Sequence, residues 1–228
     1  MTRVAVVFGA SGGIGGALVA ALRARDEFGL VLGYSRRTTP GFDLTDEDSI
    51  SARVADAAAQ GDIRLAIDAT GVLHDAELNP EKSWREVAPQ ALQRAFAVNA
   101  TGPMLLMKHL LPRLPREGRA VFATLSARVG SIGDNRLGGW YGYRASKAAL
   151  NQFLRCAAVE LARRAPEAIC VALHPGTVAT SLSEPFAKHG LTVHRPEAAA
   201  ANLLSVLDGL SPAETGGFFD WRGDPIPW

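Results

Sequence analysis

The sequence predicts an α/β fold, a doubly wound parallel sheet with helices on both faces, formed by a single domain over residues 1–228. Three observations predict it. Short apolar runs alternate with segments of helical composition along the whole chain, as in parallel sheets with crossover helices. The first run, residues 4–8, is continuously apolar, as expected for a strand buried on both faces. No repeat, low-complexity tract or composition break marks a linker.

The predicted strands are short apolar runs bounded by turn residues. They cover residues 4–8, 30–35, 63–69, 119–125, 169–173 and 217–219. Ligands of open parallel sheets bind beyond the carboxyl ends of the strands. Each glycine- or proline-containing segment considered below follows such an end.

The predicted helices are rich in alanine, leucine and charged residues. They cover residues 14–25, 45–59, 90–111, 141–164 and 196–207. Thr45 with Asp48 resembles a capping box at the start of the second helix. Gly102 and Pro103 interrupt the third helix, and Pro196 suits the first position of the last.

The composition is that of an ordinary globular protein, with 47% hydrophobic and 21% charged residues. The formal net charge of +1 gives no overall field that attracts nucleic acid, so no nucleic-acid partner is expected. The chain enters its first strand directly after Arg3, without the features of a signal peptide, and no apolar run is long enough to cross a bilayer. We therefore expect no membrane partner and a cytoplasmic location.

Cys156 and Cys170 lie in apolar stretches without CxxC spacing, so we expect two small buried side chains and no disulfide framework. The five histidines are scattered and show neither an HExxH pattern nor Cys/His ligand spacing. No metal site is expected.

A glycine-rich turn follows the first strand and opens the first helix, with Gly9, Ser11, Gly13, Ile14 and Gly15 as candidate cofactor-binding residues. Glycine lets the chain turn tightly and lets backbone amides approach a pyrophosphate. The helix N-terminus adds N–H donors and the positive end of its dipole. Glycines also make plain turns, but this position between an apolar strand and a helix predicts a Rossmann-type dinucleotide site.

The end of the second strand selects between the two nicotinamide dinucleotides. An acidic residue there would bind the ribose hydroxyls of NAD, but the sequence has Arg36 and Arg37. Because a guanidinium binds phosphate well, NADP(H) is favoured over NAD(H). The alternative is two solvated surface arginines. Asp43, which we place at the next strand end, could accept a hydrogen bond from the adenine amino group or only support a turn.

Tyr143 and Lys147 stand at i and i+4 near the start of a predicted helix and therefore share one face. A phenol normally keeps its proton up to about pH 10. A neighbouring ammonium and oxidised nicotinamide favour the phenolate, so we expect a lowered pKa for Tyr143. Such a tyrosine can protonate a developing alkoxide or accept the proton in the oxidative direction, and Lys147 could also bind the nicotinamide ribose.

Four motifs occur in order along essentially the whole chain. They are Gly9-x-x-x-Gly13-x-Gly15, Asn99 within Val98-Asn99-Ala100-Thr101-Gly102, Tyr143-x-x-x-Lys147 and Pro175-Gly176-x-x-x-Thr180. This ordered set resembles the short-chain dehydrogenase/reductase family. Residues 130–132 and 139–143 look like its subgroup of small carbonyl reductases and C-factor-type proteins.

The resemblance implies roles for further residues. Asn99 would hold a water in a proton relay that reaches Lys147. The nicotinamide would be contacted by Pro175, Gly176, Val178 and Thr180, with Thr180 fixing the carboxamide, and the cofactor also by Leu44, Ala69 and Gly71. Residues 181–194 stand where the family places a substrate lid. An apolar pocket could be lined by Trp140, Phe186 and Trp221, each of which is as readily explained by packing.

The sequence departs from the family pattern at three places. Phe8 replaces the threonine that usually precedes the first glycine, and Asp68-Ala69-Thr70-Gly71 stands where an Asn-Asn-Ala-Gly segment is usual. The structural hydrogen bonds of that segment must therefore be made differently.

The third departure concerns the catalytic serine expected after the fourth strand. An ungapped comparison anchored on Gly130 and Tyr143 places Ala127 at that position. Ser126 is the nearest hydroxyl and our candidate catalytic serine, and Ser131 is another. Because strand neighbours face opposite ways, Ser126 reaches the substrate only if the backbone differs locally.

The leading hypothesis is an NADP(H)-dependent oxidoreductase that reduces an aldehyde, ketone or quinone to an alcohol, with Tyr143 as general acid/base. The alternative is an NADP(H)-binding signalling or regulatory protein of C-factor type with little turnover, which Ala127 favours. A methyltransferase would leave Tyr143 and Lys147 without a role, and a larger sugar-nucleotide enzyme would need a longer region after Thr180. The family resemblance suggests a homodimer or homotetramer.

Overall fold

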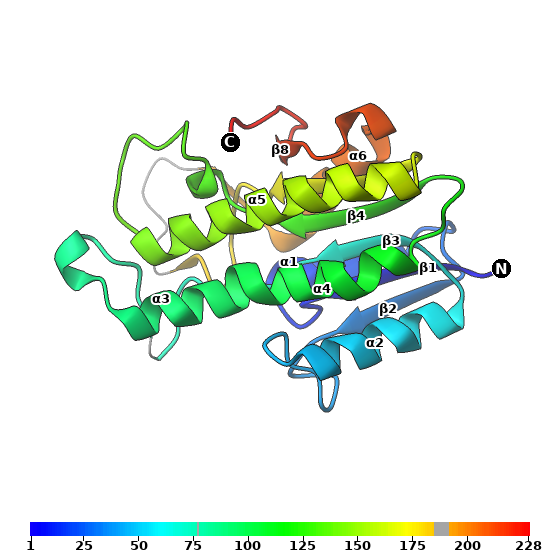
Figure 1. The fold of residues 1–228 in the computed structure, drawn as a ribbon, viewed down its shortest axis with the longest axis horizontal. Helices are drawn as coiled ribbons and strands as arrows, with labels where there is room; N and C mark the ends of the chain where they lie inside the picture. The colour runs from blue at the N-terminus through cyan, green and yellow to red at the C-terminus, as the bar shows by residue number, and fades with distance from the viewer. Residues whose placement is uncertain (77, 185–191) are drawn as a thin grey trace.

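A computed structural model describes residues 1–76, 78–184 and 192–228. Its central sheet has six parallel strands in the order β2-β1-β3-β4-β5-β8 (Figure 1). Their bounds are β1 Arg3–Phe8, β2 Leu30–Tyr34, β3 Asp62–Asp68, β4 Ala120–Leu125, β5 Ala168–His174 and β8 Phe218–Asp220. A small separate ladder pairs β6 (Thr177–Val178) with β7 (Val193–His194). The parallel sheet predicted from the sequence is confirmed.

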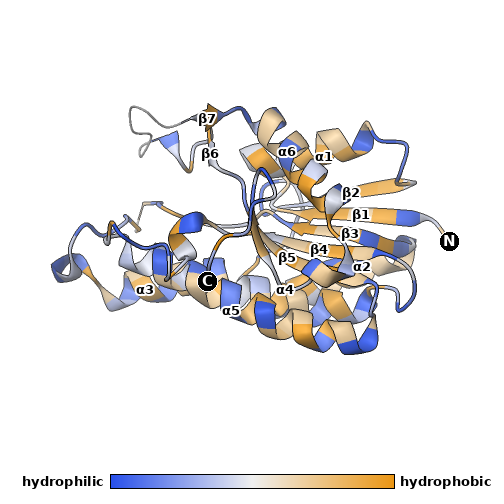
Figure 2. Ribbon diagram, turned by 90° about the horizontal axis from the view of Figure 1, so that it is seen from above, coloured by the Kyte–Doolittle hydropathy of each residue, from blue (hydrophilic) through white to orange (hydrophobic). Residues whose placement is uncertain are grey.

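Helices cover both faces of this sheet (Figure 2). Helices α1 and α6 pack on one face, and α2, α4 and α5 pack on the other. The bounds are α1 Gly13–Arg23, α2 Glu47–Gln60, α3 Pro89–Phe96, α4 Gly102–Leu110, α5 Tyr141–Arg164 and α6 Pro196–Gly209. Shorter turns are the π-helical turn Ala97–Thr101 and the 3-10 turns Trp84–Glu86, Leu111–Arg113, Arg128–Gly130 and Pro212–Glu214. The doubly wound arrangement is therefore confirmed as well.

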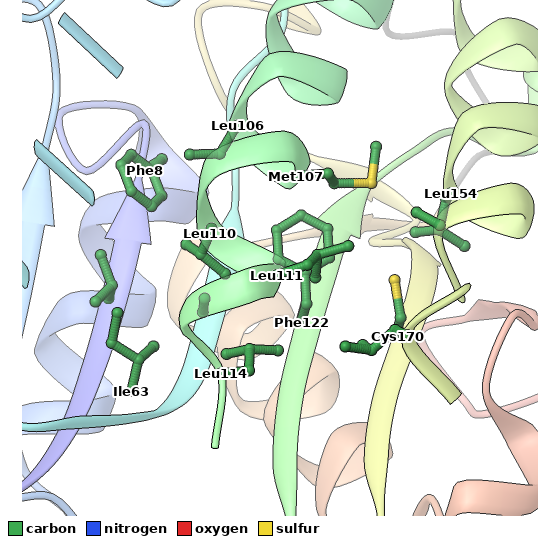
Figure 3. Packing of buried hydrophobic residues seen from close by; sticks show 14 of the residues in the cluster. Phe8, Ile63, Leu106, Met107, Leu110, Leu111, Leu114, Phe122, Leu154 and Cys170 are labelled. Carbon is green, nitrogen blue, oxygen red and sulfur yellow. The ribbon is translucent and has the colours of Figure 1, made fainter. Parts of the chain in front are cut away.

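Two apolar layers hold the sheet between its helices. On β4, Phe122 faces α4 and α5, whereas Val121 and Ala123 face α1 and α6, as alternation along a strand requires. Figure 3 shows part of the first layer, in which side chains of α4 and α5 project toward Phe122 and Cys170. Because both faces of the sheet are covered, the first strand is apolar and buried throughout residues 4–8.

The helix predicted over residues 90–111 forms as α3, the π-helical turn and α4, and its irregularity precedes Gly102 and Pro103. Pro103 has no N–H, and its ring would crowd the carbonyl group of Asn99 in a regular helix. The Gly102 N–H bonds instead to Ala97 O, five residues back, which widens the turn. The chain thus continues as a helix and places Asn99 in the widened turn.

The start of α2 corrects the predicted capping box. The N-cap is Asp46, whose carboxylate accepts the Asp48 N–H at 3.0 Å. Thr45 donates its N–H and its hydroxyl to Asp43 Oδ1, each at 2.8 Å. The Thr45 hydroxyl is therefore occupied and does not cap the helix.

The segment between β2 and α2 is a loop, so the expected strand end at Asp43 is wrong. Pro40 lacks an N–H for strand pairing, and Gly41 has a φ of 74°, which turns the chain. Leu44, a predicted cofactor contact, is buried in the layer beneath α4. Only its backbone can therefore face a ligand.

The two cysteines differ in exposure. Cys170 is buried on β5 as predicted, but Cys156 is exposed on α5, so the prediction was wrong there. The apolar residues around Cys156 in the sequence point to different sides of a helix, and only one side faces the core. No helix in the described ranges is long and apolar enough to span a membrane.

Candidate active site

The glycine-rich turn lies at the carboxyl end of β1, against the ends of both neighbouring strands. Gly9 has a φ of 83°, in the left-handed region that favours glycine. The Gly9 and Ala10 N–H groups donate to Tyr34 O of β2 at 2.8 and 3.1 Å. A Cβ on Gly15 would lie 2.2 Å from Gly9 O. The turn is therefore closed too tightly for side chains at these glycines.

The first turn of α1 is suited to a bound anion. Its N-cap, Gly12, offers no capping side chain, and no acidic residue lies in the first turn. Gly12 and Gly13 are exposed, so the N–H donors and the positive end of the dipole face outward. A Cβ on Gly13 would lie 2.7 Å from Thr180 Cγ2. This cradle, bordered by the predicted nicotinamide segment, fits the pyrophosphate of a dinucleotide.

The two arginines after β2 are exposed and have different partners. Arg37 donates to Ser11 O at 2.8 Å and so joins the end of β2 to the glycine turn. The pKa of the Asp43 carboxyl is lowered, mainly by the Thr45 N–H bond and to a lesser degree by the charge of Arg36. Asp43 therefore supports a turn, which was one of the two roles expected for it.

Ala69 and Gly71 carry the chain from the glycine turn toward the reacting residues. The Ala69 N–H donates to Phe8 O at 2.9 Å, and a Cβ on Gly9 would lie 2.6 Å from Ala69 O. A Cβ on Gly71 would lie 3.5 Å from Lys147 Nζ. This short segment therefore contacts both ends of the candidate site.

The segment after β5 closes the other side, with Pro175, Gly176, Val178 and Thr180 in order. Gly176 has a φ of 77°, and a Cβ there would lie 2.9 Å from Trp221 Cδ1. The rings of His194 and Trp221 meet edge-on at 4.4 Å between centroids. The C-terminal segment thus contributes an aromatic side chain beside this turn.

The predicted lid, residues 181–194, is covered only in part, because residues 185–191, including Phe186, lie outside the described residues. Both flanks are attached to the site. His74 Nε2 lies 3.0 Å from Ser181 O, and β7 pairs in parallel with β6. The segment therefore leaves and returns next to Thr180.

Tyr143 lies in the first turn of α5, whose start is fixed by distant residues. The N-cap residue Trp140 has a left-handed φ of 53°, and its ring lies edge-on to that of Tyr143 at 6.2 Å between centroids. Glu81, 4% exposed, accepts the Gly142 N–H through both carboxylate oxygens at 3.1 and 3.3 Å. This carboxylate caps α5 in place of the missing N-cap side chain.

Burial dominates the titration of both candidate reacting groups. It raises the pKa of Tyr143 to about 12. It lowers the pKa of Lys147 to about 8, against an opposing effect of Asp68. Burial thus raises the pKa of Tyr143, whereas the sequence predicted a lowered value from the Lys147 ammonium and oxidised nicotinamide and did not count desolvation. At neutral pH Tyr143 keeps its proton and most of the Lys147 amine is charged.

Asn99 is fully buried and links two segments through its side-chain amide. Its Oδ1 accepts the Val72 N–H, and its Nδ2 donates to Val72 O, both at 2.8 Å. Nδ2 also donates to Ser146 Oγ of α5 at 3.2 Å. The π-helical turn thus joins the segment after β3 to the helix that carries Tyr143 and Lys147.

These residues can be compared with those of known proteins. The family model described as short chain dehydrogenase matches residues 3–190. A 1-hydroxy-2-glutathionyl-2-methyl-3-butene dehydrogenase from Rhodococcus sp. (strain AD45) is 33% identical over 190 residues, or 83% of this chain and 79% of that protein. The chain belongs to the short-chain dehydrogenase family.

Two further proteins are similar to this chain, one in sequence and one in fold. C-signal of Myxococcus xanthus is 38% identical over 137 residues, which are 60% of this chain and 78% of that protein. An NADPH-bound carbonyl reductase from chicken fatty liver has the same fold, with a TM-score of 0.85 at 24% identity over 100% of this chain and 96% of that one. The family resemblance seen in the motifs is confirmed.

In this short-chain dehydrogenase the hydroxyl of Ser126 is directed to α5. Ser126 Oγ donates to Asn151 Oδ1 at 2.6 Å, and the residue is 4% exposed. Ser131 Oγ accepts the Asp134 N–H at 3.0 Å and is also buried. Both residues are described, and neither is hydrogen-bonded to Tyr143. The role of Ser126 as catalytic hydroxyl stays a prediction.

Glu81 and Asn151 are not predicted from the sequence, and Asp68 stands out there only as a departure from the family pattern. Asn151 had a signal, because it stands four residues after Lys147 on the same helix face. Asp68 had one too, as an acid ending an apolar strand. Glu81 had none, since its loop meets α5 only in the folded chain. Among the described residues, no group of three or more potential ligand side chains could hold a metal ion.

Proposed function

We propose that this short-chain dehydrogenase is an NADP(H)-dependent oxidoreductase that reduces an aldehyde, ketone or quinone to the alcohol. One arrangement carries the proposal: residues 69–71 connect the glycine turn to Lys147, so a dinucleotide seated on α1 would reach Tyr143. Family membership and the shared fold with an NADPH-bound carbonyl reductase support the same reaction class. Residues 1–228 would form one catalytic domain, with 181–194 as its lid.

The cofactor would be held mainly by backbone groups. The pyrophosphate would bind the turn formed by Gly9, Ser11, Gly13, Ile14 and Gly15. The nicotinamide end would bind Ala69, Gly71, Pro175, Gly176, Val178 and Thr180, and the backbone of Leu44 and the carboxylate of Asp43 would lie toward the adenine. When bound, NADPH supplies the hydride that reduces the carbonyl carbon.

Tyr143 would supply the proton to the carbonyl oxygen. Burial raises the pKa of Tyr143 to about 12, so the phenol carries its proton at neutral pH and is ready to donate it. The Lys147 ammonium would then stabilise the phenolate, in a buried site where charges interact strongly. Asn99 would order the proton path to Lys147. Ser126 would have to release Asn151 before its hydroxyl could donate to a substrate.

Arg36 would bind the 2′-phosphate of NADP(H). Arg37 is already joined to Ser11 O, whereas among the described residues no hydrogen bond to Arg36 is formed. A guanidinium–phosphate contact of this kind favours NADPH over NADH. Because neither residue is acidic, nothing at this strand end suits the free ribose hydroxyls of NAD.

The test is to mix purified protein with NADPH or NADH and a panel of aldehydes, ketones and quinones, and to follow the nicotinamide absorbance. We expect carbonyl-dependent loss of NADPH at a higher kcat/KM than of NADH. Arg36→Ala should weaken NADPH binding about tenfold or more, and leave NADH binding unchanged. Arg163→Ala, at the exposed end of α5, is the matched control. A folded protein that binds NADPH but turns over nothing on the panel contradicts the proposal.

A second candidate is an NADP(H)-binding signalling or regulatory protein with little turnover. Two observations favour it: the 38% identity to C-signal over 137 residues, and Ala127 at the family's serine position. Tight NADPH binding without turnover, together with full biological effect of Tyr143→Phe, would select this function. Loss of the effect in Tyr143→Phe would count against it.

The proposal also covers the oligomeric state of the protein and its location in the cell. We expect a homodimer or homotetramer in the cytoplasm, with a small carbonyl or alcohol compound as the substrate. Light scattering of the purified protein and cell fractionation test these two expectations. A monomer, or a protein recovered outside the cytoplasm, would contradict them.

A further inference from the structure

Asp68 is a buried acidic residue at the carboxyl end of β3 that the proposed reaction does not use. Its side chain is 0% exposed. Oδ1 accepts the Thr70 N–H at 3.0 Å and the Thr70 hydroxyl at 2.5 Å, and Oδ2 accepts the Thr124 hydroxyl at 2.8 Å. An ionised carboxylate can only accept hydrogen bonds, so this set of donors fits the charged form.

Lys147 is the buried group of opposite charge next to this carboxylate. It is 3% exposed, and its Nζ donates to Leu125 O at 2.8 Å. Leu125 directly follows Thr124, the hydroxyl donor to Asp68, on β4. Gly71 lies in the segment that follows Asp68, and a Cβ on Gly71 would lie 3.5 Å from Lys147 Nζ. Asp68 therefore ends β3, and the Lys147 ammonium of α5 lies against the last residue of the adjacent strand β4.

The two charges interact through the protein interior. They do not form a contact ion pair among the described residues, since each is satisfied by neutral partners. A low dielectric between buried groups nevertheless makes such an interaction stronger than it would be in water. Asp68 therefore acts on Lys147 through the electric field of its carboxylate.

The other charged groups around Lys147 do not replace Asp68. The titratable side chains of the surrounding elements are Tyr143 and Arg144 on α5, Arg94 on α3, Arg128 after β4, His174 on β5, and Glu81 in the loop that caps α5. The arginines have the same sign as an ammonium, and of the described carboxylates only Asp68 acts appreciably on the Lys147 charge. Burial lowers the pKa of Lys147, and Asp68 raises it.

We propose that Asp68 is a positioning residue that keeps the buried Lys147 in its charged form and so preserves the cation beside Tyr143. A buried ammonium without a nearby negative charge tends to lose its proton. A neutral side chain at position 68 could still bond Thr70 and Thr124 but would leave that ammonium uncompensated. The effect of Asp68 on catalysis rests on the proposed function. The titration of Lys147, which tests the inference, does not depend on it.

The experiment measures the titration of Lys147 directly. The chain has four lysines, Lys82, Lys108, Lys147 and Lys188, so ε-¹³C-lysine labelling gives few NMR signals, and Lys147→Met assigns the relevant one. Asp68→Asn should move the Lys147 midpoint downward by about one pH unit or more. The matched control is Asp208→Asn, which removes an exposed carboxylate paired with Arg25 on the surface and should leave the midpoint in place.

Activity provides the second readout. In Asp68→Asn the alkaline decline of kcat should begin at lower pH, by the same interval as the NMR midpoint, with KM for NADPH unchanged at low pH. Asp68→Glu, which keeps the charge, should restore the profile in part. If circular dichroism shows that the asparagine variant does not fold, Asp68→Ser takes its place.

A Lys147 midpoint that is the same in wild type and in a folded neutral variant would overturn the inference. Because the signal comes from the lysine itself, the two proposals can fail separately. A shifted midpoint in a protein that reduces no carbonyl compound contradicts the proposed reaction and supports the role of Asp68.

Discussion

The glycine-rich turn and the reacting end of this short-chain dehydrogenase are built in different ways. The turn, residues 9–15, consists of sequence neighbours and presents mainly backbone N–H groups. The reacting end draws Asp68, Asn99, Tyr143 and Lys147 from β3, the π-helical turn and α5, and consists of side chains that are buried or, for Tyr143, half-buried. The turn is therefore sensitive to added volume, whereas the reacting end is sensitive to protonation and charge.

The largest effect should come from the reacting end. Tyr143→Phe removes the proposed proton donor and leaves the ring in contact with Trp140, so kcat/KM for carbonyl reduction should fall about 10³-fold. The Kd for NADPH should not change, because the turn is untouched. Steady-state kinetics and fluorescence titration check this, with Tyr141→Phe as the control two residues away. A variant that keeps a large share of wild-type activity would remove Tyr143 from the mechanism.

The turn should respond to a single methyl group. A Cβ on Gly15 would lie 2.2 Å from the backbone oxygen of Gly9, so Gly15→Ala forces the backbone apart. We expect the free energy of unfolding to fall by about 3 kcal/mol, with weaker NADPH binding. Urea denaturation measures the change. Gly209→Ala is the control, because a Cβ there meets nothing within 4 Å. Equal stability of the two variants would show that the turn can relax.

The smallest effect should come from Ser126, which lies just after β4 and whose hydroxyl is held by Asn151 of α5. Ser126→Ala removes the bond to Asn151 at 2.6 Å, and we expect kcat to fall only about tenfold. Ser131→Ala serves as the comparison, because its hydroxyl is also held by the protein. A loss as large as that of Tyr143→Phe, at unchanged stability, would instead establish Ser126 as the catalytic hydroxyl predicted from the sequence.

Local patterns were sufficient for much of the fold and for part of the site. The apolar run before Gly9 predicted a buried parallel strand, and the i and i+4 spacing placed Tyr143 and Lys147 on one face of α5. Patterns failed where a competing contact was invisible in the sequence. Thr45 did not cap α2 because Asp43 holds its hydroxyl, and Cys156 faces outward because only one side of α5 meets the core.

The sequence by itself determined the class of fold, the place of the glycine turn and the identity of the Tyr–Lys pair, because these follow from periodicity and from spacing within single elements. Only the tertiary structure decided the direction of the Tyr143 and Lys147 pKa changes, the partner of Ser126 and the position of Asp68 beside the lysine. Burial and electric fields depend on which elements pack against one another. Residues 68, 126 and 147 come near one another only when β3, the end of β4 and α5 are packed together.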